Sequence, residues 1–256
     1  MNDKKEVIVQ KFFDKTSSIY SQYFDKQNKS GKTYNFNKRL EIISNMSAKS
    51  SGAMLDCAVG DGQITAQVIK SGNFTRIFLV DISEKMLEIA KGNCQPVVKT
   101  DLDLETAHSD IYDFLDSHEP NVYDLVICSG LIAHISDAPR LMKLLHKVLS
   151  ANGKIILQST LLDNPITAIV KSLTEKDYYA KNGYMIKYYR HQDILQLCKL
   201  AHLEIESHQR FSMGLQFLDN KLPPKLNYFL EVFFEGISRF VGSESIYLLR
   251  SQTRLT

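Results

Sequence analysis

Residues 53–160 alternate between short apolar runs and longer segments in which apolar residues recur with helical spacing. The runs that are apolar throughout predict buried strands, at 53–59, 76–81, 96–101, 123–130 and 153–160. The segments with helical spacing predict helices, at 62–72, 83–93 and 137–150. Because apolar strands separated by helices need cover on both faces, this order predicts an α/β fold with a largely parallel sheet.

Small and acidic residues follow the strands of this predicted sheet. Right-handed crossovers place the carboxyl ends of parallel strands at one edge, where doubly wound sheets bind ligands. The residues expected at that edge are Asp56, Ala58, Gly60, Gly62, Asp81, Asp101, Ser129, Gly130 and Leu131. A glycine turn before a helix lets a ligand approach backbone N–H groups. The dinucleotide fingerprint G-x-G-x-x-G is incomplete here, because Thr65 stands at its third glycine.

Composition narrows the classes of function. The formal net charge of the 256-residue chain is +2, which argues against a broad basic face for nucleic acid. The four cysteines are far apart and form no metal-binding or disulfide pattern, so we expect reduced cysteines, no metal and a cytoplasmic protein. No apolar run reaches the roughly 18 residues that a membrane-spanning helix needs, and the first residues do not read as a signal peptide.

The order of these features resembles the class I S-adenosylmethionine-dependent methyltransferases, in the small-molecule branch with ubiquinone-biosynthesis and tetrapyrrole enzymes. The resemblance covers roughly residues 50–161. Typical members carry an acidic residue and G-x-G-x-G after the first strand, and Ala58 replaces the first glycine here. An alanine fits there if its backbone φ stays negative.

The resemblance also implies an architecture. We expect a Rossmann-like, seven-stranded, mostly parallel sheet with helices on both faces, completed by a strand at 203–213 and an antiparallel last strand in "ESIYLLRSQ". Residues 1–49 are expected to form an N-terminal helical cap, residues 50–161 the cofactor-binding core, and residues 162–256 an acceptor-side lid with the final strands.

The resemblance assigns S-adenosylmethionine to the glycine turn, with S-adenosylhomocysteine as its product. The turn from Asp56 to Gly62 would hold the methionine part of the cofactor, and Asp81 would accept hydrogen bonds from both ribose hydroxyls. Asp81 is alternatively a cap of the helix that follows it. Ile82 and Met86 would pack on the adenine ring, or belong to the core as an ordinary i, i+4 pair.

Further cofactor contacts are expected after the third and fourth strands. Asp101 with Leu102 would meet the amino edge of adenine, although Asp103 is a competing carboxylate. Ser129, Gly130 and Leu131 would lie beneath the sulfonium, where small residues allow close approach.

The N-terminal segment 12–25 has an amphipathic pattern with aromatic residues at three- and four-residue steps: Phe12, Phe13, Tyr20, Tyr23 and Phe24. We expect this helix to cover the cofactor cleft. Tyr20 and Arg39 are candidates for the cofactor's carboxylate, although an arginine on such a helix is often simply solvated.

His134, just after the fourth strand, is the candidate catalytic residue, as a base that takes a proton from an acceptor hydroxyl. It is alternatively a cap for the helix near Asp137. His191 is expected to cap its own helix. A base is needed only if the acceptor arrives protonated, because holding the acceptor near the methyl group supplies much of the catalysis.

Two aromatic segments bear on the acceptor. Tyrosines at 178–189 fit either a wall around an aromatic or amphipathic small molecule or a helix packed on the sheet edge. In 227–242, an apolar stripe predicts a core helix, whereas exposed it would suit a membrane or lipidic acceptor. The stripe consists of Phe229, Val232, Phe233, Ile237 and Phe240.

The main hypothesis is an enzyme that methylates an oxygen of a small biosynthetic metabolite. Methylation of nitrogen or carbon, a nucleotide-dependent oxidoreductase, and a binding protein that keeps the fold without catalysis remain alternatives. Residues 129–132 do not form an N-P-P-Y-like pocket, which argues against adenine or glutamine nitrogen as the acceptor.

Overall fold

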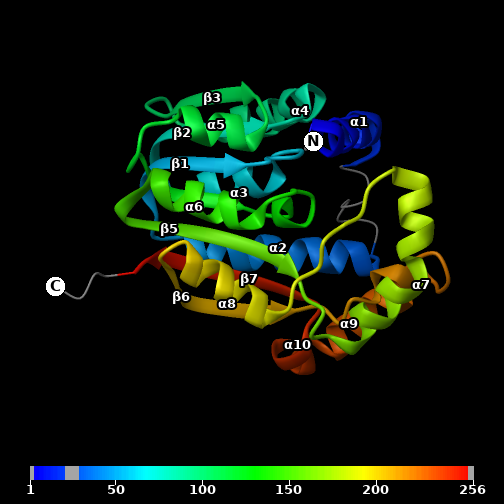
Figure 1. The fold of residues 1–256 in the computed structure, drawn as a ribbon. Helices are drawn as coiled ribbons and strands as arrows, with labels where there is room; N and C mark the ends of the chain where they lie inside the picture. Colours follow the sequence, from blue (N-terminus) through cyan, green and yellow to red (C-terminus); the bar gives the residue numbers. More distant parts are fainter. Residues whose placement is uncertain (1–2, 21–28, 253–256) are drawn as a thin grey trace.

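A single seven-stranded sheet forms the centre of the computed structural model, which describes residues 3–20 and 29–252. The strand order is β3-β2-β1-β4-β5-β7-β6 (Figure 1). The strands are β1 (Ser51–Cys57), β2 (Asn73–Asp81), β3 (Asp103–His108), β4 (Tyr123–Cys128), β5 (Leu149–Thr160), β6 (Leu203–Phe211) and β7 (Glu244–Ser251). Only β7 runs antiparallel to its neighbours, so the predicted mostly parallel sheet with an antiparallel last strand is confirmed.

Helices cover both faces of the sheet. The helices on one face are α5 (Ile111–Ser117), α6 (Ala138–Val148) and α8 (His191–Leu200), and those on the other are α2 (Gly31–Ser47), α3 (Gln63–Ser71) and α4 (Glu84–Cys94). Each layer closes its own apolar core against the sheet. Strands β1 and β4 are shared by both cores, because their alternate side chains point to opposite faces.

The predicted third strand at 96–101 is wrong. Residues Gln95–Val97 form the 3-10 helix η2, and β3 begins at Asp103. Pro96 has no N–H to donate to a sheet ladder, which disfavours a strand there. The true edge strand β3 mixes charged and apolar residues, because one side of it faces solvent, and so it lacks the uninterrupted apolar run of the inner strands.

Two helices lie beyond the carboxyl ends of the parallel strands. Helix α1 (Asp3–Tyr20) packs against α4, and α7 (Pro165–Asn182) follows β5 at the same end of the sheet (Figure 1). Helix α1 belongs to the segment 1–49 that was expected to form an N-terminal cap, and Tyr23 and Phe24 lie outside the described residues. Together these helices enclose the edge at which the glycine turn lies.

Helices α9 (Pro224–Phe233) and α10 (Glu235–Val241) pack by their polar side. Glu231 is fully buried and accepts hydrogen bonds from the backbone N–H of Met213 (2.7 Å) and Leu215 (2.8 Å). Asn227, one turn earlier, donates to the Leu215 carbonyl. The apolar stripe predicted to be core therefore faces outward, so that prediction is wrong. In the described residues, no helix is long and apolar enough to cross a membrane.

Candidate functional site

The glycine turn between β1 and α3 is held by the neighbouring strand. The backbone N–H groups of Ala58 and Val59 both donate to the carbonyl of Val80, at 2.8 and 3.0 Å. Gly62 starts α3, and a Cβ there would lie 2.8 Å from the Cα of Ala90 on α4. A larger residue would thus push the two helices apart. The turn is positioned by the sheet and by close helix packing, before any ligand binds.

Ala58 has a φ of +83°, so the condition of a negative φ is not met. An L-residue with a side chain is strained in this left-handed region, by about 1–2 kcal/mol. The turn thus keeps the backbone conformation that glycine favours, and the methyl group of Ala58 makes that conformation strained. The replacement of the first family glycine has therefore left the turn in a glycine-like conformation.

Gly60 lies beneath Tyr20 at the top of the turn. In the part of the chain that the structure describes, a Cβ built on Gly60 would have a single neighbour within 4 Å, the ring of Tyr20 at 3.9 Å. Tyr20 is the last residue of α1, so the N-terminal helix delivers an aromatic ring directly over the turn. Of the two residues proposed for the cofactor's carboxylate, Tyr20 is therefore brought to the glycine turn.

Asp81 ties the turn to the end of β2. Its Oδ2 accepts the Gly60 N–H at 2.9 Å and its Oδ1 accepts the Ser83 N–H at 2.9 Å. Burial raises the pKa of Asp81, and the two backbone N–H groups oppose this shift. The N-cap of α4 is Ser83 itself, so Asp81 braces the helix entry without being its cap. The carboxylate lines a pocket at the strand ends, where a ribose would meet it.

Asp56 has a different environment from the one expected. Its side chain is buried beneath the turn and accepts a hydrogen bond from Thr65 on α3. Burial raises the pKa of Asp56 to about 7, and the nearby Asp81 carboxylate adds to the effect. Asp56 lines neither cavity at the strand ends, so it supports the turn from below.

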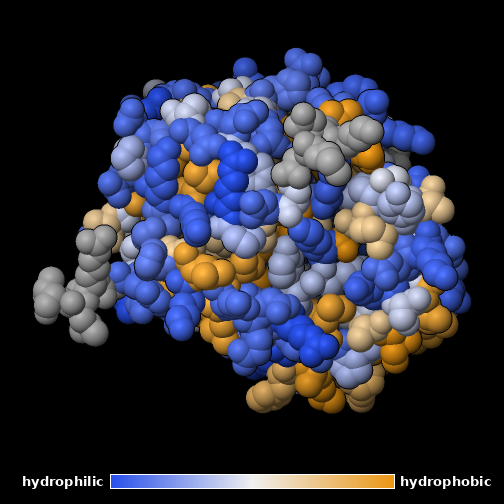
Figure 2. Space-filling model, in the orientation of Figure 1, coloured by the Kyte–Doolittle hydropathy of each residue, from blue (hydrophilic) through white to orange (hydrophobic). Residues whose placement is uncertain are grey.

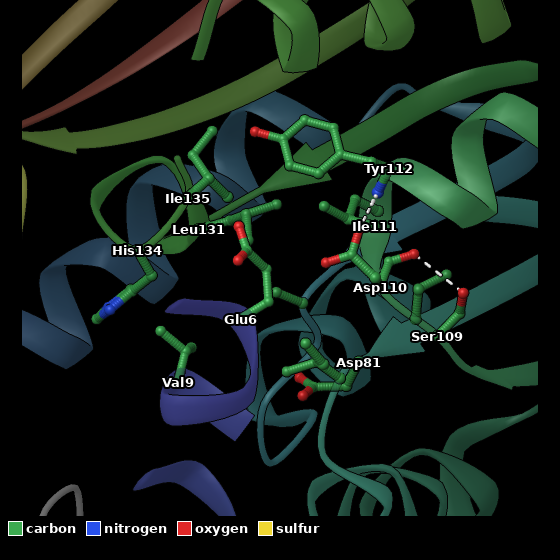
Figure 3. A pocket seen from close by; sticks show the side chains of 13 residues that line it. Glu6, Val9, Asp81, Ser109, Asp110, Ile111, Tyr112, Leu131, His134 and Ile135 are labelled. Atoms are coloured by element: carbon green, nitrogen blue, oxygen red, sulfur yellow. Dashed lines mark hydrogen bonds between the residues drawn. The ribbon is translucent and has the colours of Figure 1, made fainter. Parts of the chain in front are cut away.

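The pocket around Asp81 is narrow and largely apolar, with a volume of about 50 Å³. Ile82, Ile111 and Leu131 form its walls, and Val9 of α1 points into it (Figure 3). Pockets that bury small ligands are usually about 300–1,000 Å³. The pocket is therefore smaller in this structure than a site that buries a whole small ligand.

Asp110, at the carboxyl end of β3, provides the acidic edge of this pocket (Figure 3). Its Oδ1 accepts the Tyr112 N–H at 2.8 Å and thereby caps α5, and burial raises the pKa of Asp110. Asp101, to which the sequence assigned the adenine contact, instead precedes β3. Because β3 runs parallel to β2, Asp101 is exposed at the opposite edge of the sheet.

Two further expected adenine contacts lie elsewhere. Leu102 accompanies Asp101 at the amino end of β3 and packs in the core beside α4. Met86 is 1% exposed and does not line the pocket, so it belongs to the core. Of the apolar pair, only Ile82 lines the pocket. These corrections follow from the shift of β3 along the chain.

A second cavity of about 490 Å³ opens next to the glycine turn. We call it the acceptor cavity. Its lining includes Tyr20 from α1, Arg39 from α2, Gly130 after β4, and Tyr188 from the segment after α7. Arg39 is partly buried, donates to Asn35 through Nη2 at 3.2 Å, and has a buried Nε without a partner. Tyr20 and Arg39 thus line one cavity. The alternative that Arg39 is only a solvent-exposed residue of its helix is excluded.

A buried polar cluster lines the acceptor cavity. Glu244 of β7 is 2% exposed and accepts hydrogen bonds from Gln158 Nε2 and from Thr160 Oγ1 at 3.0 Å. Burial raises the pKa of Glu244, and the positive charge of Arg39 opposes the shift. Since Nε2 donates to the carboxylate, the amide oxygen of Gln158 points away from Glu244. That oxygen is buried and has no hydrogen-bond partner among residues 3–20 and 29–252.

The unpartnered oxygen of Gln158 lies beside Gly130. Among the described residues, a Cβ built on Gly130 has this Oε1, at 3.9 Å, as its only neighbour within 4 Å. A hydrogen-bond acceptor from Gln158 therefore lies beside Gly130. Ser129, the other small residue expected here, has a buried Oγ without a partner but does not line the cavity.

His134 lies between the two cavities and lines both. Its Nδ1 is 3.1 Å from the Tyr184 hydroxyl, and the ring of Phe13 packs edge-on against it. Burial and the nearby Lys5 lower the pKa of His134 to about 4, so the ring is neutral at physiological pH. Asp137 caps α6 itself, so the alternative role of His134 as that cap is excluded.

Sequence reasoning missed Asp110, Gln158 and Glu244. Asp110 had a usable signal, because "SD" precedes a short helical segment and an acidic N-cap is common. Gln158 and Glu244 are far apart in the chain and meet only because β7 inserts beside β5. His191 does not cap α8, whose N-cap is Arg190. Among the described residues, no group of His, Cys, Asp or Glu is arranged to hold a metal ion.

Comparison with known proteins identifies this architecture. A family model described as a methyltransferase domain matches residues 48–209, more than half of the chain. A characterised relative, the ubiquinone biosynthesis O-methyltransferase of Neisseria meningitidis, is 24% identical over 166 residues, which cover 64% of this chain and 68% of that protein.

Solved structures agree on the fold. Magnesium protoporphyrin IX methyltransferase (ChlM) from Synechocystis, with bound S-adenosylhomocysteine, has a TM-score of 0.63 and 16% identity, covering 96% of this chain and all of that one. The 4+2 cyclase SpnF has a TM-score of 0.66 and 13% identity, covering 96% and 95% of the two chains. At these identities the likeness concerns the fold.

Replacing Ala58 by glycine should stabilise the protein. Removal of the methyl group relieves left-handed strain, and the larger entropy of glycine in the unfolded chain offsets part of the gain, so we expect a net increase of about 0.5–1 kcal/mol in the free energy of unfolding. Urea denaturation measures this value. Ala66→Gly, within α3, is the control and should lose about 1 kcal/mol. A loss of stability in both variants would contradict the strained turn.

We propose that Asp110, and not Asp101, lies on the adenine side of the cofactor site, and calorimetric titration with S-adenosylhomocysteine tests this. Asp81→Ala should weaken binding at least tenfold, because hydrogen bonds to a carboxylate contribute about 1.5–3 kcal/mol. Asp110→Asn, which keeps an acceptor for the α5 cap, should weaken binding about three- to tenfold. Asp101→Ala is the matched control and should bind like the wild type. Binding to NAD, or a loss with Asp101→Ala alone, would refute this assignment.

Proposed function

Because this chain belongs to the methyltransferase domain family and uses S-adenosylmethionine as its methyl donor, we propose that it methylates a hydroxyl oxygen of a small-molecule acceptor. The observation that carries the proposal is the unpartnered Oε1 of Gln158 beside Gly130. The acceptor cavity, at about 490 Å³, lies within the usual range for small ligands. Its tyrosines and polar residues suit an aromatic or amphipathic acceptor.

Gln158 favours oxygen as the methylated atom. An amide oxygen accepts a hydrogen bond, so it pairs with an acceptor group that carries a proton, such as a hydroxyl. Glu244 fixes which end of the amide faces the cavity, because a carboxylate only accepts hydrogen bonds. A carbon nucleophile would leave Gln158 without a partner, at a cost of about 1–3 kcal/mol. The arrangement therefore selects for hydroxyl acceptors over carbon acceptors.

The methyl donor supplies an electrophilic methyl group on a positively charged sulfur. The residues of this chain supply position: Asp81 and the Gly60 turn hold the nucleoside side, and Gln158 orients the acceptor hydroxyl beside Gly130. Good positioning of two reactants is worth about 7–11 kcal/mol. Most of the catalysis we propose is therefore positional.

His134 is proposed to take the acceptor's proton. When Nδ1–H donates to the Tyr184 oxygen, the neutral ring keeps Nε2 as its basic nitrogen. An oxygen that has gained a methyl group while still protonated is a strong acid, so even an imidazole with a pKa of about 4 is basic enough to accept that proton. Tyr184, whose hydroxyl lies 3.1 Å from Nδ1, would fix the orientation of the ring, as a positioning residue.

A screen with isotopically labelled methyl donor tests the reaction. Candidate acceptors are hydroxylated aromatic, quinone-like and sugar-linked compounds, and the labelled carbon is located in the product by NMR. A methyl group on oxygen is the expected result. A methyl group on carbon would overturn the role given to Gln158, and a methyl group on nitrogen would overturn the choice of oxygen, while labelled transfer to any atom would still agree with the family.

With an acceptor in hand, Gln158→Met should reduce kcat/KM about tenfold or more, because the hydroxyl loses its hydrogen-bond partner. Affinity for S-adenosylhomocysteine should stay unchanged. Glu244→Gln should give a smaller loss, since it frees the Gln158 amide to rotate. Ser159→Ala, on the same cavity wall, is the control and should retain wild-type kinetics. Equal losses in Gln158→Met and Ser159→Ala would contradict the proposal.

The pH profile tests His134. A base must be neutral to act, and burial holds the pKa of His134 at about 4. The rate should therefore persist as pH falls through ~6.5, where an ordinary histidine becomes protonated, and decline only on approach to pH ~4. His134→Gln should lower kcat about a hundredfold or more. A midpoint near pH 6.5, or unchanged kcat in the variant, would exclude the base role.

A further inference from the structure

The outer side of α9 and α10 exposes a set of large apolar side chains. We call it the α9–α10 face. Its members and their exposed fractions are Leu226 45%, Phe229 60%, Val232 43%, Phe233 68%, Ile237 52% and Phe240 77%. Figure 2 shows apolar residues gathered along this edge of the molecule, near α7, α9 and α10 of Figure 1. Contiguous apolar surface of this kind on a folded protein marks an interaction site.

The exposure follows from how the helices are attached. Glu231 and Asn227, one helical turn apart, are both fully buried and bind the backbone of residues 212–215. A helix that turns its polar side to the protein must turn its apolar side outward. The outward face is therefore built into the fold, and it cannot be buried by rotating α9 without unpairing the Glu231 carboxylate.

The fully exposed charged residues of segment 217–241 all have one sign. The exposed ionisable residues of segment 217–241 are Lys221, Lys225 and Arg239. The acidic residues of the segment are buried or paired. Glu231 is buried, and Glu235 pairs with Lys38 at 2.7 Å. Asp219 accepts hydrogen bonds from the backbone N–H groups at the start of α2. Within segment 217–241 the surface thus offers phenylalanines with cations, and Glu235, whose side chain is 30% exposed, is paired with Lys38.

This combination points to an anionic lipid surface. Apolar side chains enter the boundary between headgroups and acyl chains, and lysine and arginine pair with anionic headgroups. A second copy of the chain would bring the same three cations against each other, which disfavours self-association through this face. We propose that the α9–α10 face docks on an anionic lipid bilayer.

The face is also next to the acceptor cavity. Phe217 and Asn220, from the segment just before α9, line that cavity, and Phe217 is 36% exposed. A protein docked through α9 and α10 would hold this side of the cavity close to the bilayer. The docking itself does not depend on the proposed reaction, and it is measured without any acceptor or methyl transfer.

Vesicle co-sedimentation of the full chain tests the proposal. The protein should pellet with vesicles of phosphatidylcholine and phosphatidylglycerol, and much less with phosphatidylcholine alone. Phe233→Ser combined with Phe240→Ser should weaken binding more than tenfold, because two exposed rings no longer enter the bilayer. Leu195→Ser combined with Leu200→Ser, exposed on α8, is the matched control and should bind like the wild type.

Charge variants separate the two contributions. Changing Lys221, Lys225 and Arg239 to glutamine should weaken binding to the anionic vesicles by about fivefold per cation and remove the preference for phosphatidylglycerol. Absence of wild-type binding to anionic vesicles would overturn the proposal. The proposal would also be overturned if the Phe233/Phe240 variant bound the vesicles as tightly as the wild type. A wild-type dimer in the absence of lipid that dissociates in this variant would overturn it as well. S-adenosylhomocysteine affinity, unchanged in every variant, confirms that each one folds.

Discussion

The hydrogen bond from the Gly60 N–H to the Asp81 carboxylate is the contact on which the site depends. It joins the turn after β1 to the end of β2, while the other carboxylate oxygen holds the start of α4 through Ser83. Burial makes this carboxylate costly unless both oxygens are paired, so the turn and the helix entry are fixed together. The strained φ of Ala58 persists because these surrounding contacts determine the backbone there.

The sequence was sufficient to predict the inner strands of the sheet and the position of the glycine turn. Strands β1, β2, β4 and β5 are buried on both faces, so their apolar runs identify them without knowledge of the fold. The edge strand β3 lacks that pattern, and its misplacement in the prediction put Asp101, instead of Asp110, at the carboxyl end of the third strand. An error in the position of one edge strand was thus enough to confuse two carboxylates that lie at opposite ends of the parallel strands.

The residues of the acceptor cavity could not be predicted, for a different reason. Gln158 is unremarkable in the sequence of β5, and its importance comes from Glu244 on the adjacent β7. Strand β7 reaches that position only after α7, α8, β6 and α9–α10 have been added to the chain. Long-range pairing of this kind leaves no local periodicity, whereas Tyr20 and Arg39 were accessible because their helices were recognisable.

The misread stripe on α9 shows why periodicity alone does not tell inside from outside. An amphipathic pattern says that a helix has two sides, and the usual inference buries the apolar one. On α9 the irregular backbone of residues 212–215 offers unpaired N–H groups, and Glu231 satisfies them at the cost of losing its own contact with water. Because the Glu231 carboxylate faces the interior, the phenylalanines on the other side of the helix must face outward. The polar contact therefore decides the orientation of the helix, and the apolar face is what remains available to a partner.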